Sequence, residues 1–233
     1  MLKAISTATL MVLAVPVSAA TTYDAFTSFN GTNPAGGFQY FAGGVPLSAP
    51  AGDCVSGLSG LTCLQTAAGS NGAGFYTSLN NLTLSTESGS NNLHVNNTQI
   101  GVAPDTGAGV FFFAPTAGTY SIYGLFNAQD DLATGVTIRA VTTLNGSTSS
   151  SVIGSLNSIP SNLVFNQTVT LNAGDSFGFN FNPGSTASHD FTAFTFTVTS
   201  AVPEPATWMS MVFGFALVGA AFRRNKRALP VRL

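Results

Sequence analysis

The chain has 233 residues and few charges, with seven Lys and Arg, nine Asp and Glu, and two His. Six of the seven cations lie in the terminal segments, so the body from 21 to 201 keeps only Arg139 against eight acidic residues, a formal charge of −7. A body without a basic patch cannot neutralise phosphates, and one without lysine cannot form a Schiff base, which excludes nucleic-acid binding and that class of covalent catalysis.

The first twenty residues have the layout of a secretory signal. Lys3 precedes an apolar run from Ala4 to Val17, and small residues follow it. These are the charged, apolar and cleavage-site parts of a signal peptide, and Pro16 together with the missing polar face argues against a structural helix. We therefore expect residues 1–20 to be a signal peptide, cleaved after Ala19 or Ala20, that directs the chain to the export machinery.

Periodicity in the body predicts strands. Apolar residues alternate with small or polar ones in Ser176–Asn182 and Phe194–Thr199, as in strands with one buried face. Phe191 is out of phase with the second run, which predicts a β-bulge near Ala193. Further strands are expected at Tyr23–Phe29, Phe38–Phe41, Gly74–Thr77, Asn81–Leu84, Val110–Phe113, Thr119–Phe126, Val136–Leu144 and Leu163–Leu171.

Turn formers such as Asn145-Gly146 and Asn172–Asp175 separate these runs, and no stretch of the body repeats with a helical period. A body of about 180 residues can bury roughly 70% of its unfolded surface, enough for one sizeable core. The sequence therefore predicts an all-β domain over 21–201, a single antiparallel β-sandwich of jelly-roll type.

Two cysteines, Cys54 and Cys63, flank a loop rich in Gly and Ser. In an exported protein such a pair is expected to form a disulfide. The spacing of the two cysteines does not fit a C-x-x-C redox motif. One cysteine pair and two distant histidines are also too few ligands for zinc. A closed loop of this size stabilises a fold by about 2.5–3 kcal/mol in the chain-entropy model.

A structural calcium ion is the one cofactor that the acidic residues suggest. Asp130 and Asp131 lie at the end of a predicted strand, and with Asp105 or Glu87 they would supply oxygen ligands. A solvated turn over Asn127–Asp131 is the alternative. No other cofactor is expected.

The sequence contains no H-E-x-x-H motif, no phosphate loop and no EF-hand loop. Gly174-Asp175-Ser176 resembles the GDS block of certain lipases, but it lies late in the chain and inside a predicted turn. His189 and Asp190 would point to opposite faces of a strand, so they do not make a triad. Facing carboxyls for a glycosidase would have to be mostly Asp, because the body has a single Glu. We therefore expect no enzyme.

Sugar binding depends on exposed aromatic rings, and the single Trp lies near the C-terminus. The body would have to use its tyrosines. Any of these can instead pack its ring against the core and keep its hydroxyl at the edge of the core. The tyrosines are Tyr23, Tyr40, Tyr76, Tyr120 and Tyr123. A carbohydrate-binding module remains an alternative function.

The last segment, residues 202–233, has three parts: a proline-rich motif, an apolar run over 206–222 and a basic cluster. The motif contains Val202, Pro203, Glu204, Pro205 and Trp208, and the cluster contains Arg223, Arg224, Lys226 and Arg227. The prolines keep the motif extended, the Trp suits a membrane interface and the cations favour a cytoplasmic C-terminus. A helix of 17 residues spans about 25 Å, short of a hydrocarbon core of about 30 Å, which suits a transient transmembrane anchor.

This order of parts closely resembles the PEP-CTERM sorting signal of Gram-negative bacteria, in its PEPxxW form. The resemblance implies an exported protein with a precursor tethered in the inner membrane. It also implies processing by an exosortase, an intramembrane-type cysteine transpeptidase or protease.

Landmarks in the body are similar to those of a widespread group of PEP-CTERM ectodomains. They are FNGTNPAGGFQYF at Phe29–Phe41, Leu93-His94, FAPTAGTY at Phe113–Tyr120 and VTLNAGD at Val169–Asp175. In that group they correspond to an NPNGxWxYG segment, an LHPG turn, an APxAGTY strand entry and an L-x-AGD turn, in domains that resemble carbohydrate-binding jelly rolls. Phe38 stands where Trp is usual, and Val95 replaces the proline.

These features together predict an exosortase-processed protein whose mature form lies at the cell surface or in the extracellular matrix. Its expected role is structural or adhesive, in association with exopolysaccharide or biofilm. The alternatives are a carbohydrate-binding module or a polysaccharide-active enzyme on the same polymer. The expected partners are the exosortase, the export machinery and the exopolysaccharide.

Overall fold

The computed structural model describes residues 19–49, 54, 61–66, 74–78, 82–85, 92–95, 99–103, 107–129, 134–184, 190–201 and 213–219. The chain divides into two units, one of Thr21–Ala201 and the other of Met1–Ala20 with Val202–Leu233. In the second unit residues 213–219 are helical. Within the described ranges, no helix has the length and hydropathy needed to cross a membrane. Most of the expected signal peptide and of the expected apolar helix lies outside these ranges.

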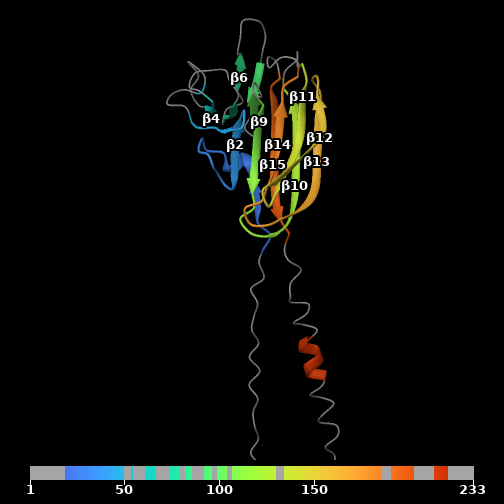
Figure 1. Cartoon of the computed structure of the whole chain (residues 1–233). Coiled ribbons are helices and arrows are strands. Elements are labelled where there is room, and N and C mark those ends of the chain that lie inside the picture. The colour runs from blue at the N-terminus through green and yellow to red at the C-terminus, as the bar shows by residue number, and fades with distance from the viewer. Residues whose placement is uncertain are drawn as a thin grey trace, which may run out of the picture. The chain divides into compact units, whose positions relative to one another are not determined.

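The body consists almost entirely of strands (Figure 1). The elements are β1 (Thr22–Asp24), α1 (Ala25–Ser28), β2 (Phe38–Ala42), β3 (Val45–Pro46), β4 (Leu61–Gln65), β5 (Gly74–Ser78), β6 (Leu82–Ser85), β7 (Asn92–Val95), β8 (Ile100–Ala103), β9 (Ala108–Phe113), β10 (Gly118–Ala128), β11 (Val136–Leu144), β12 (Ser147–Leu156), β13 (Asn162–Leu171), β14 (Ser176–Asn182) and β15 (Thr192–Ser200).

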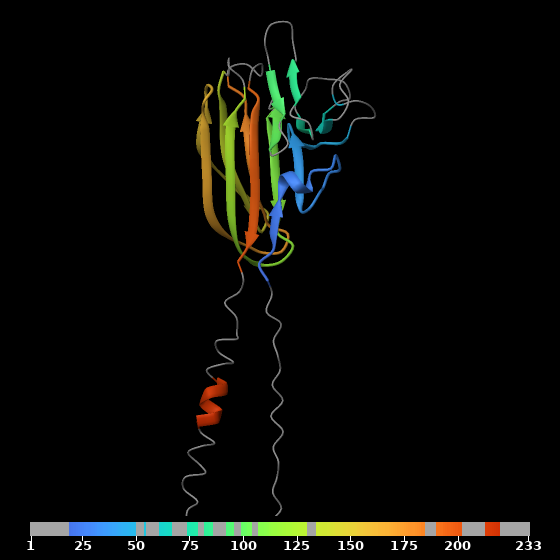
Figure 2. The ribbon, with the colours of Figure 1, turned by 180° about the vertical axis from the view of Figure 1, so that it is seen from behind.

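Two sheets make the sandwich. Sheet A has the order β13-β10-β15-β8-β5-β4, with β1 beside β15, and sheet B has the order β12-β11-β14-β9-β2-β3. Figure 1 looks onto sheet B and Figure 2 looks onto sheet A. The strands β6 and β7 form a separate two-stranded ribbon.

The strand order is that of a jelly roll. In sheet A the order β8-β15-β10-β13 matches β9-β14-β11-β12 in sheet B, and the chain changes sheet at every step from β8 to β15 except the β11–β12 hairpin. Every described strand pair is antiparallel. Two interlocked Greek keys of this kind define the jelly roll, so the predicted architecture is confirmed.

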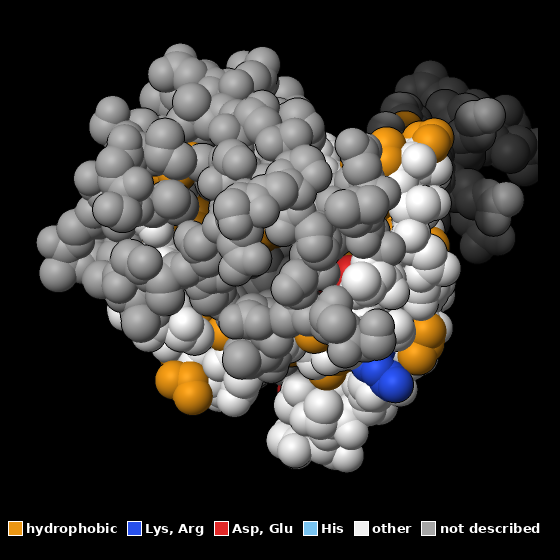
Figure 3. All heavy atoms as spheres, turned by 90° about the horizontal axis from the view of Figure 1, so that it is seen from above, with side chains coloured by type: hydrophobic (Ala, Val, Ile, Leu, Met, Phe, Trp, Pro, Cys, Tyr) orange, Lys and Arg blue, Asp and Glu red, His pale blue; other side chains and the backbone are white. Residues whose placement is uncertain are grey.

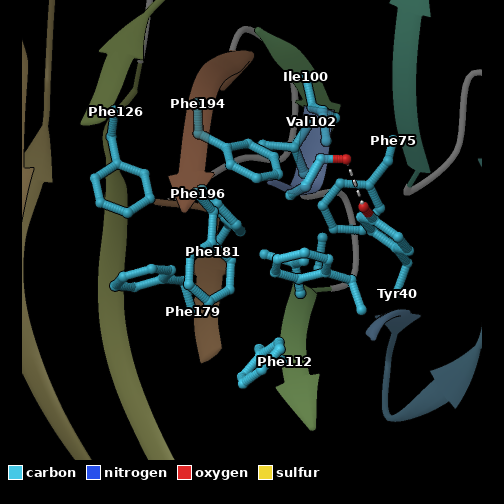
Figure 4. Packing of buried hydrophobic residues seen from close by; sticks show 14 of the residues in the cluster. Tyr40, Phe75, Ile100, Val102, Phe112, Phe126, Phe179, Phe181, Phe194 and Phe196 are labelled. Carbon is cyan, nitrogen blue, oxygen red and sulfur yellow. Dashed lines mark hydrogen bonds between the residues drawn. The ribbon is translucent and has the colours of Figure 1, made fainter. Parts of the chain in front are cut away.

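Phenylalanine rings fill the space between the sheets (Figure 4). Phe179 of β14 packs against Phe126 of β10 at 4.8 Å between ring centroids and against Phe196 of β15 at 4.9 Å, both edge to face. Phe181 and Phe194 meet from opposite sheets at 5.1 Å between centroids, with their rings tilted by 42°. All residues of this core cluster lie between Ala25 and Val198, so the body contains its whole core.

Several local predictions were wrong. The expected strand over Tyr23–Phe29 stops at Asp24, because the Asp24 carboxylate accepts a 2.9 Å hydrogen bond from the Thr27 amide and caps helix α1. Leu93-His94, likened to a turn, lies in strand β7 opposite β6. Strands β3, β4, β7, β8 and β12 were not predicted; β12 carries the run Ser147–Ser151 and has no apolar alternation to reveal it.

The predicted bulge near Ala193 was also wrong. Strand β15 pairs with β10 in unbroken register from Tyr120↔Ser200 to Ala128↔Thr192. Phe191 precedes the strand and its side chain is only half-buried, so no extra residue is needed to bring it inward. A register shift occurs instead between β11 and β12, at Ile138/Arg139.

One end of the sandwich is closed by the APTAGTY segment. The Tyr120 hydroxyl donates to the Thr116 carbonyl at 2.7 Å, the hydrogen bond of a tyrosine corner. Beside it, the Thr119 carbonyl accepts from the Ala201 amide at 2.7 Å, and the Thr21 carbonyl accepts from the Ser200 amide at 2.9 Å. The first and last residues of the body therefore meet at this end.

The neighbouring NAGD turn is held by Asp175. Its carboxylate accepts hydrogen bonds from the amides of Asn145 and Asn172, each at 2.8 Å. These backbone donors, first that of Asn145, lower the pKa of Asp175. Gly174 takes φ +86°, and its amide donates to Ala114 of the APTAGTY segment at 2.8 Å. The interpretation of Gly174-Asp175-Ser176 as turn chemistry is thus confirmed.

Candidate functional site

A groove of about 580 Å³ lies on the outer face of sheet B. Seen from above, the surface is notched between two lobes on the side onto which Figure 1 looks (Figure 3). The lining comes from β2, β9, β14, β11 and β12, and from the turns after β2 and before β9. It consists of Phe41, Gly43, Gly44, Gly107, Gly109, Phe111, Phe113, Val141, Thr143, Thr148, Ser176, Asn180 and Asn182.

Strand alternation places three phenylalanines in this groove. Phe112 of β9 points into the core, so its neighbours Phe111 and Phe113 point outward and are only half-buried. Phe41 of β2 also points outward, and its ring meets that of Phe111 edge to face at 5.6 Å between centroids. The groove therefore presents aromatic surface that the protein itself covers only in part.

Two glycines let the Phe111 ring lie low on the sheet. A Cβ on Gly178 of β14 would come within 2.5 Å of Phe111 Cδ1, and one on Gly109 would come within 2.7 Å of Phe111 Cε2. Gly178 is the direct partner of Phe111 across the β9–β14 pair. Because neither position has a side chain, the ring packs against the backbone of both strands.

Polar groups stand beside the rings. Asn180 and Asn182 of β14 point out of sheet B because Phe179 and Phe181 point into the core. Thr143 and Thr148 line the β11–β12 side, and their hydroxyls lie 3.0 Å apart in a hydrogen bond. Amides and hydroxyls next to flat apolar rings suit a ligand that has both polar edges and apolar faces, such as a sugar chain.

The tyrosines weighed from the sequence do not form this site. Tyr40, Tyr76 and Tyr120 are buried. The Tyr40 hydroxyl donates to the Ala25 carbonyl at 3.3 Å (Figure 4), and burial raises its pKa. Tyr23 packs against the core cluster from a half-buried position, and Tyr123, on the outer face of sheet A, is 38% exposed.

Sequence reasoning missed Phe41, Phe111 and Phe113. One signal was available: three consecutive phenylalanines, Phe111–Phe113, cannot all face the core from one strand. Their convergence with Phe41 and Asn180 was not readable, because it depends on which strands are neighbours.

Of the His189-Asp190 pair, the structure describes only Asp190. This residue is 1% exposed, and its carboxylate accepts hydrogen bonds from the Thr134 and Gly135 amides at 2.9 and 3.0 Å and from the Gly184 amide at 2.9 Å. It therefore ties the β10–β11 connection to the β14–β15 connection. His189 lies outside the described residues.

The expected disulfide is present between Cys54 and Cys63, whose Cα atoms are 5.8 Å apart. Gln65 is 2% exposed, and its amide group donates to the Cys54 carbonyl, which fixes the loop to strand β4. Neither cysteine lies in the groove lining.

The remaining predicted sites fall outside the described residues. These are the calcium candidates Glu87, Asp105, Asp130 and Asp131, the motif residues Val202, Pro203, Glu204, Pro205 and Trp208, and the basic residues Arg223, Arg224, Lys226 and Arg227. Among the residues that are described, no three His, Cys, Asp or Glu side chains are grouped to hold a metal ion.

Solved structures with related architecture have low sequence identity to this chain. The K2 adhesin domain of Lys-gingipain is 12% identical, with 78% of this chain and 98% of that chain covered and a TM-score of 0.39. A family 35 carbohydrate-binding module from Clostridium thermocellum is 12% identical, with 79% and 100% covered and a TM-score of 0.33. The N-terminal cellulose-binding domain of Cellulomonas fimi β-1,4-glucanase C is 14% identical, with 81% and 99% covered and a TM-score of 0.31. At these scores the likeness carries no argument about function.

No curated protein matches the sequence. A family model does match the C-terminal segment: the PEP-CTERM protein-sorting motif covers residues 201–227 and begins where strand β15 has ended. The expected family resemblance is thereby confirmed for this segment. The chain carries a PEP-CTERM sorting motif behind a β-sandwich body, which implies an exported protein with a membrane-anchored precursor that is processed by an exosortase.

Proposed function

We propose that the mature protein is an adhesive or structural component of the cell surface or extracellular matrix, and that it holds exopolysaccharide in the groove of sheet B. The observation that carries this proposal is the Phe111 ring, which lies on the backbone of Gly109 and Gly178 beside Phe41 and remains partly exposed. A partly exposed ring on a rigid strand is preorganised to receive the apolar face of a sugar ring.

The groove chemistry favours binding over the enzymatic alternative. Its lining side chains carry aromatic, aliphatic, hydroxyl and amide groups. Such groups orient a polysaccharide, whereas glycoside hydrolysis needs a pair of carboxyls on either side of the bond. A polysaccharide-active enzyme would need that pair elsewhere in the body.

The terminal segments serve delivery in this proposal. Residues 1–20 are the signal peptide, and the helix over 206–222 is the transient anchor. Arg223, Arg224, Lys226 and Arg227 keep the C-terminus in the cytoplasm, and the exosortase acts at the motif around Pro203 and Trp208. The first and last residues of the body meet at one end of the sandwich, so both removable segments join it there.

Delivery is tested by the mass of mature protein recovered from the producing cells. The expected product lacks the first twenty residues and the basic tail, and a strain without exosortase accumulates the tailed precursor in its membrane. Mature protein that keeps Arg223–Arg227 and stays soluble inside the cell would refute this part of the proposal.

Adhesion is tested by retention of the body, residues 21–201, on the exopolysaccharide of the producing cells. Phe111→Ala removes the groove ring, and Tyr123→Ala is a matched control that removes an exposed ring from sheet A. The proposal expects Phe111→Ala to lose retention and Tyr123→Ala to keep it. Retention of the wild-type body no better than that of an unrelated β-sandwich would dismiss the proposal.

A further inference from the structure

Arg139 is the only cation of the body and lies on the groove side of the sandwich. Ile138 and Ala140 of β11 point into the core, so Arg139 between them points out of sheet B and is half-buried. Its direct partner on the next strand is Asn180, which lines the groove. The sole positive charge of a body with a formal charge of −7 thus stands at the proposed binding face.

A single cross-strand row joins this cation to the aromatic side of the groove. Phe41 is paired with Gly109, Gly109 with Asn180, and Asn180 with Arg139, each on the neighbouring strand. Three inter-strand spacings of about 4.8 Å separate the two ends of the row, roughly 14 Å in all. Gly109 has no side chain and is covered by the Phe111 ring and the Asn180 amide, so the row reads ring, glycine, amide and guanidinium in succession.

The register shift between β11 and β12 falls at this arginine. Ile138 pairs with Gly154 and Arg139 pairs with Val152, which leaves Ile153 as an extra residue on β12. Bulges twist a strand locally and turn its side chains toward new directions, and they are common beside binding sites. Here the irregularity lies at the end of the row that carries the charge.

The Arg139 guanidinium has no ion-pair or hydrogen-bond partner among the described residues. The acids that the structure describes are occupied elsewhere: Asp24 caps α1 in the β1 region of sheet A, Asp175 holds the NAGD turn, and Asp190 is buried between two loops. A cation beside a groove, with its five donors unused by the described residues, is available to a ligand.

Resting on the proposed function, we propose that the groove selects an acidic polysaccharide, one whose sugar rings carry carboxylates of the uronic-acid type. A ring of the polymer packs on Phe111 and Phe41, Asn180 binds its hydroxyls, and Arg139 receives the carboxylate of a neighbouring sugar in a two-pronged hydrogen bond. Planar guanidinium and planar carboxylate match in this geometry, which a neutral hydroxyl does not offer.

The overall negative charge of the body does not outweigh this contact. Charges separated by more than about 10 Å are largely screened at physiological salt, and among the described acids Asp24 lies beside sheet A and Asp190 is buried between two loops. A direct Arg139–carboxylate pair acts at hydrogen-bond distance and is screened much less. The body therefore repels acidic polymers weakly at long range and binds one carboxylate locally.

The test compares two forms of one polymer, the exopolysaccharide of the producing cells in its native form and after chemical reduction of its carboxyl groups to alcohols. Binding to the wild-type body is measured with two variants. Arg139→Gln removes the cation and keeps most of its length. Thr168→Asp, an exposed position on the outer face of sheet A, lowers the net charge by the same single unit away from the groove.

We expect wild type to bind the native polymer about tenfold more tightly than the reduced polymer. Arg139→Gln should lose that preference and bind both forms like the reduced one, and Thr168→Asp should behave as wild type. Higher salt should narrow the difference between the polymers for wild type and for Thr168→Asp, and Arg139→Gln should show no difference to narrow.

Equal binding of both polymers by wild type, with Arg139→Gln unchanged, would overturn the acidic-ligand inference and leave the adhesive groove intact. Equal losses for Arg139→Gln and Thr168→Asp would overturn it too, because net charge alone would then explain them. Failure of wild type to bind either polymer would remove the proposed function itself. Unfolding curves of both variants, expected to match wild type, show whether a loss comes from the fold.

Discussion

The space between the sheets and the groove outside sheet B are built from the same residue type, used in two ways. In the core, Phe179 meets Phe126, Phe165, Phe177 and Phe196, and no part of its ring is exposed. In the groove, Phe111 has one aromatic neighbour among the described residues, Phe41, and two glycines beneath it, and remains partly exposed.

This difference separates stability from recognition within single strands. On β9 the inward residue Phe112 serves the core, and its neighbours Phe111 and Phe113 serve the groove. A ring whose contacts are all internal contributes to folding, because its burial is complete before any ligand arrives. A ring left half-covered keeps apolar surface that a ligand can bury. Substitutions on the two sides should therefore have different readouts.

The core side of the comparison predicts the largest effect. Phe179→Ala should lower the free energy of unfolding of residues 21–201 by about 3–5 kcal/mol, since it removes a fully buried ring and leaves a cavity. Denaturant unfolding followed by circular dichroism measures it. A loss below about 1 kcal/mol would mean that the core can collapse around the gap and that the rings between the sheets are not interlocked.

A substitution in the groove should reduce ligand binding more than it reduces stability. Phe111→Ala should weaken binding to the exopolysaccharide by about 1–3 kcal/mol, roughly tenfold or more, because aromatic anchors dominate binding energies. Its unfolding free energy should fall by less than that of Phe179→Ala. Titration on immobilised polymer gives the first number and the denaturant curve the second. Equal loss of stability in both variants would erase the distinction between the two regions.

The glycine beneath the Phe111 ring provides a further test of the difference between core and groove. Gly109→Ala should reduce binding several-fold with little effect on the fold, because the new methyl meets only the side chains of Phe111 and Asn180. Gly118→Ala is the control, since its new methyl would lie 3.9 Å from the Tyr120 ring, at ordinary van der Waals contact. Binding by Gly109→Ala equal to that by the control would show that the low position of the ring does not matter.

The tyrosine corner belongs to the stability side. Tyr120→Phe should lower the free energy of unfolding by about 0.5–1.5 kcal/mol, because it removes the hydrogen bond to the Thr116 carbonyl and keeps the ring. Binding to the polymer should be unaffected, and the same two assays check both statements. A loss of binding without a loss of stability would show that this end of the sandwich belongs to the functional site.

The smallest predicted effect is a change in the stability of the fold at low pH. Because the folded state lowers the pKa of Asp175, its contribution is present above the ordinary Asp value of about 3.9 and is lost as the pH falls through the lowered value. Wild type should therefore lose stability more steeply than Asp175→Asn as the medium is acidified below about pH 4. Parallel curves for the two proteins would contradict the role assigned to the NAGD turn.

The sequence by itself determined the sorting motif, the disulfide and the strands whose alternation is clean. Strand β11 has the predicted bounds Val136–Leu144, and β14 has the predicted bounds Ser176–Asn182. These features are local: alternation, cysteine spacing, and the order of motif, apolar run and cations can each be read within a few tens of residues.

Only the tertiary structure decided the groove and the edge of the sandwich. Strand β12 is a strand because β11 and its hairpin turn hold it, although its serines carry no pattern. The row from Phe41 through Gly109 and Asn180 to Arg139 joins four strands that are far apart in the chain. Strand order and register create that row, and both follow from how the jelly roll buries its phenylalanines, which no short stretch of sequence contains.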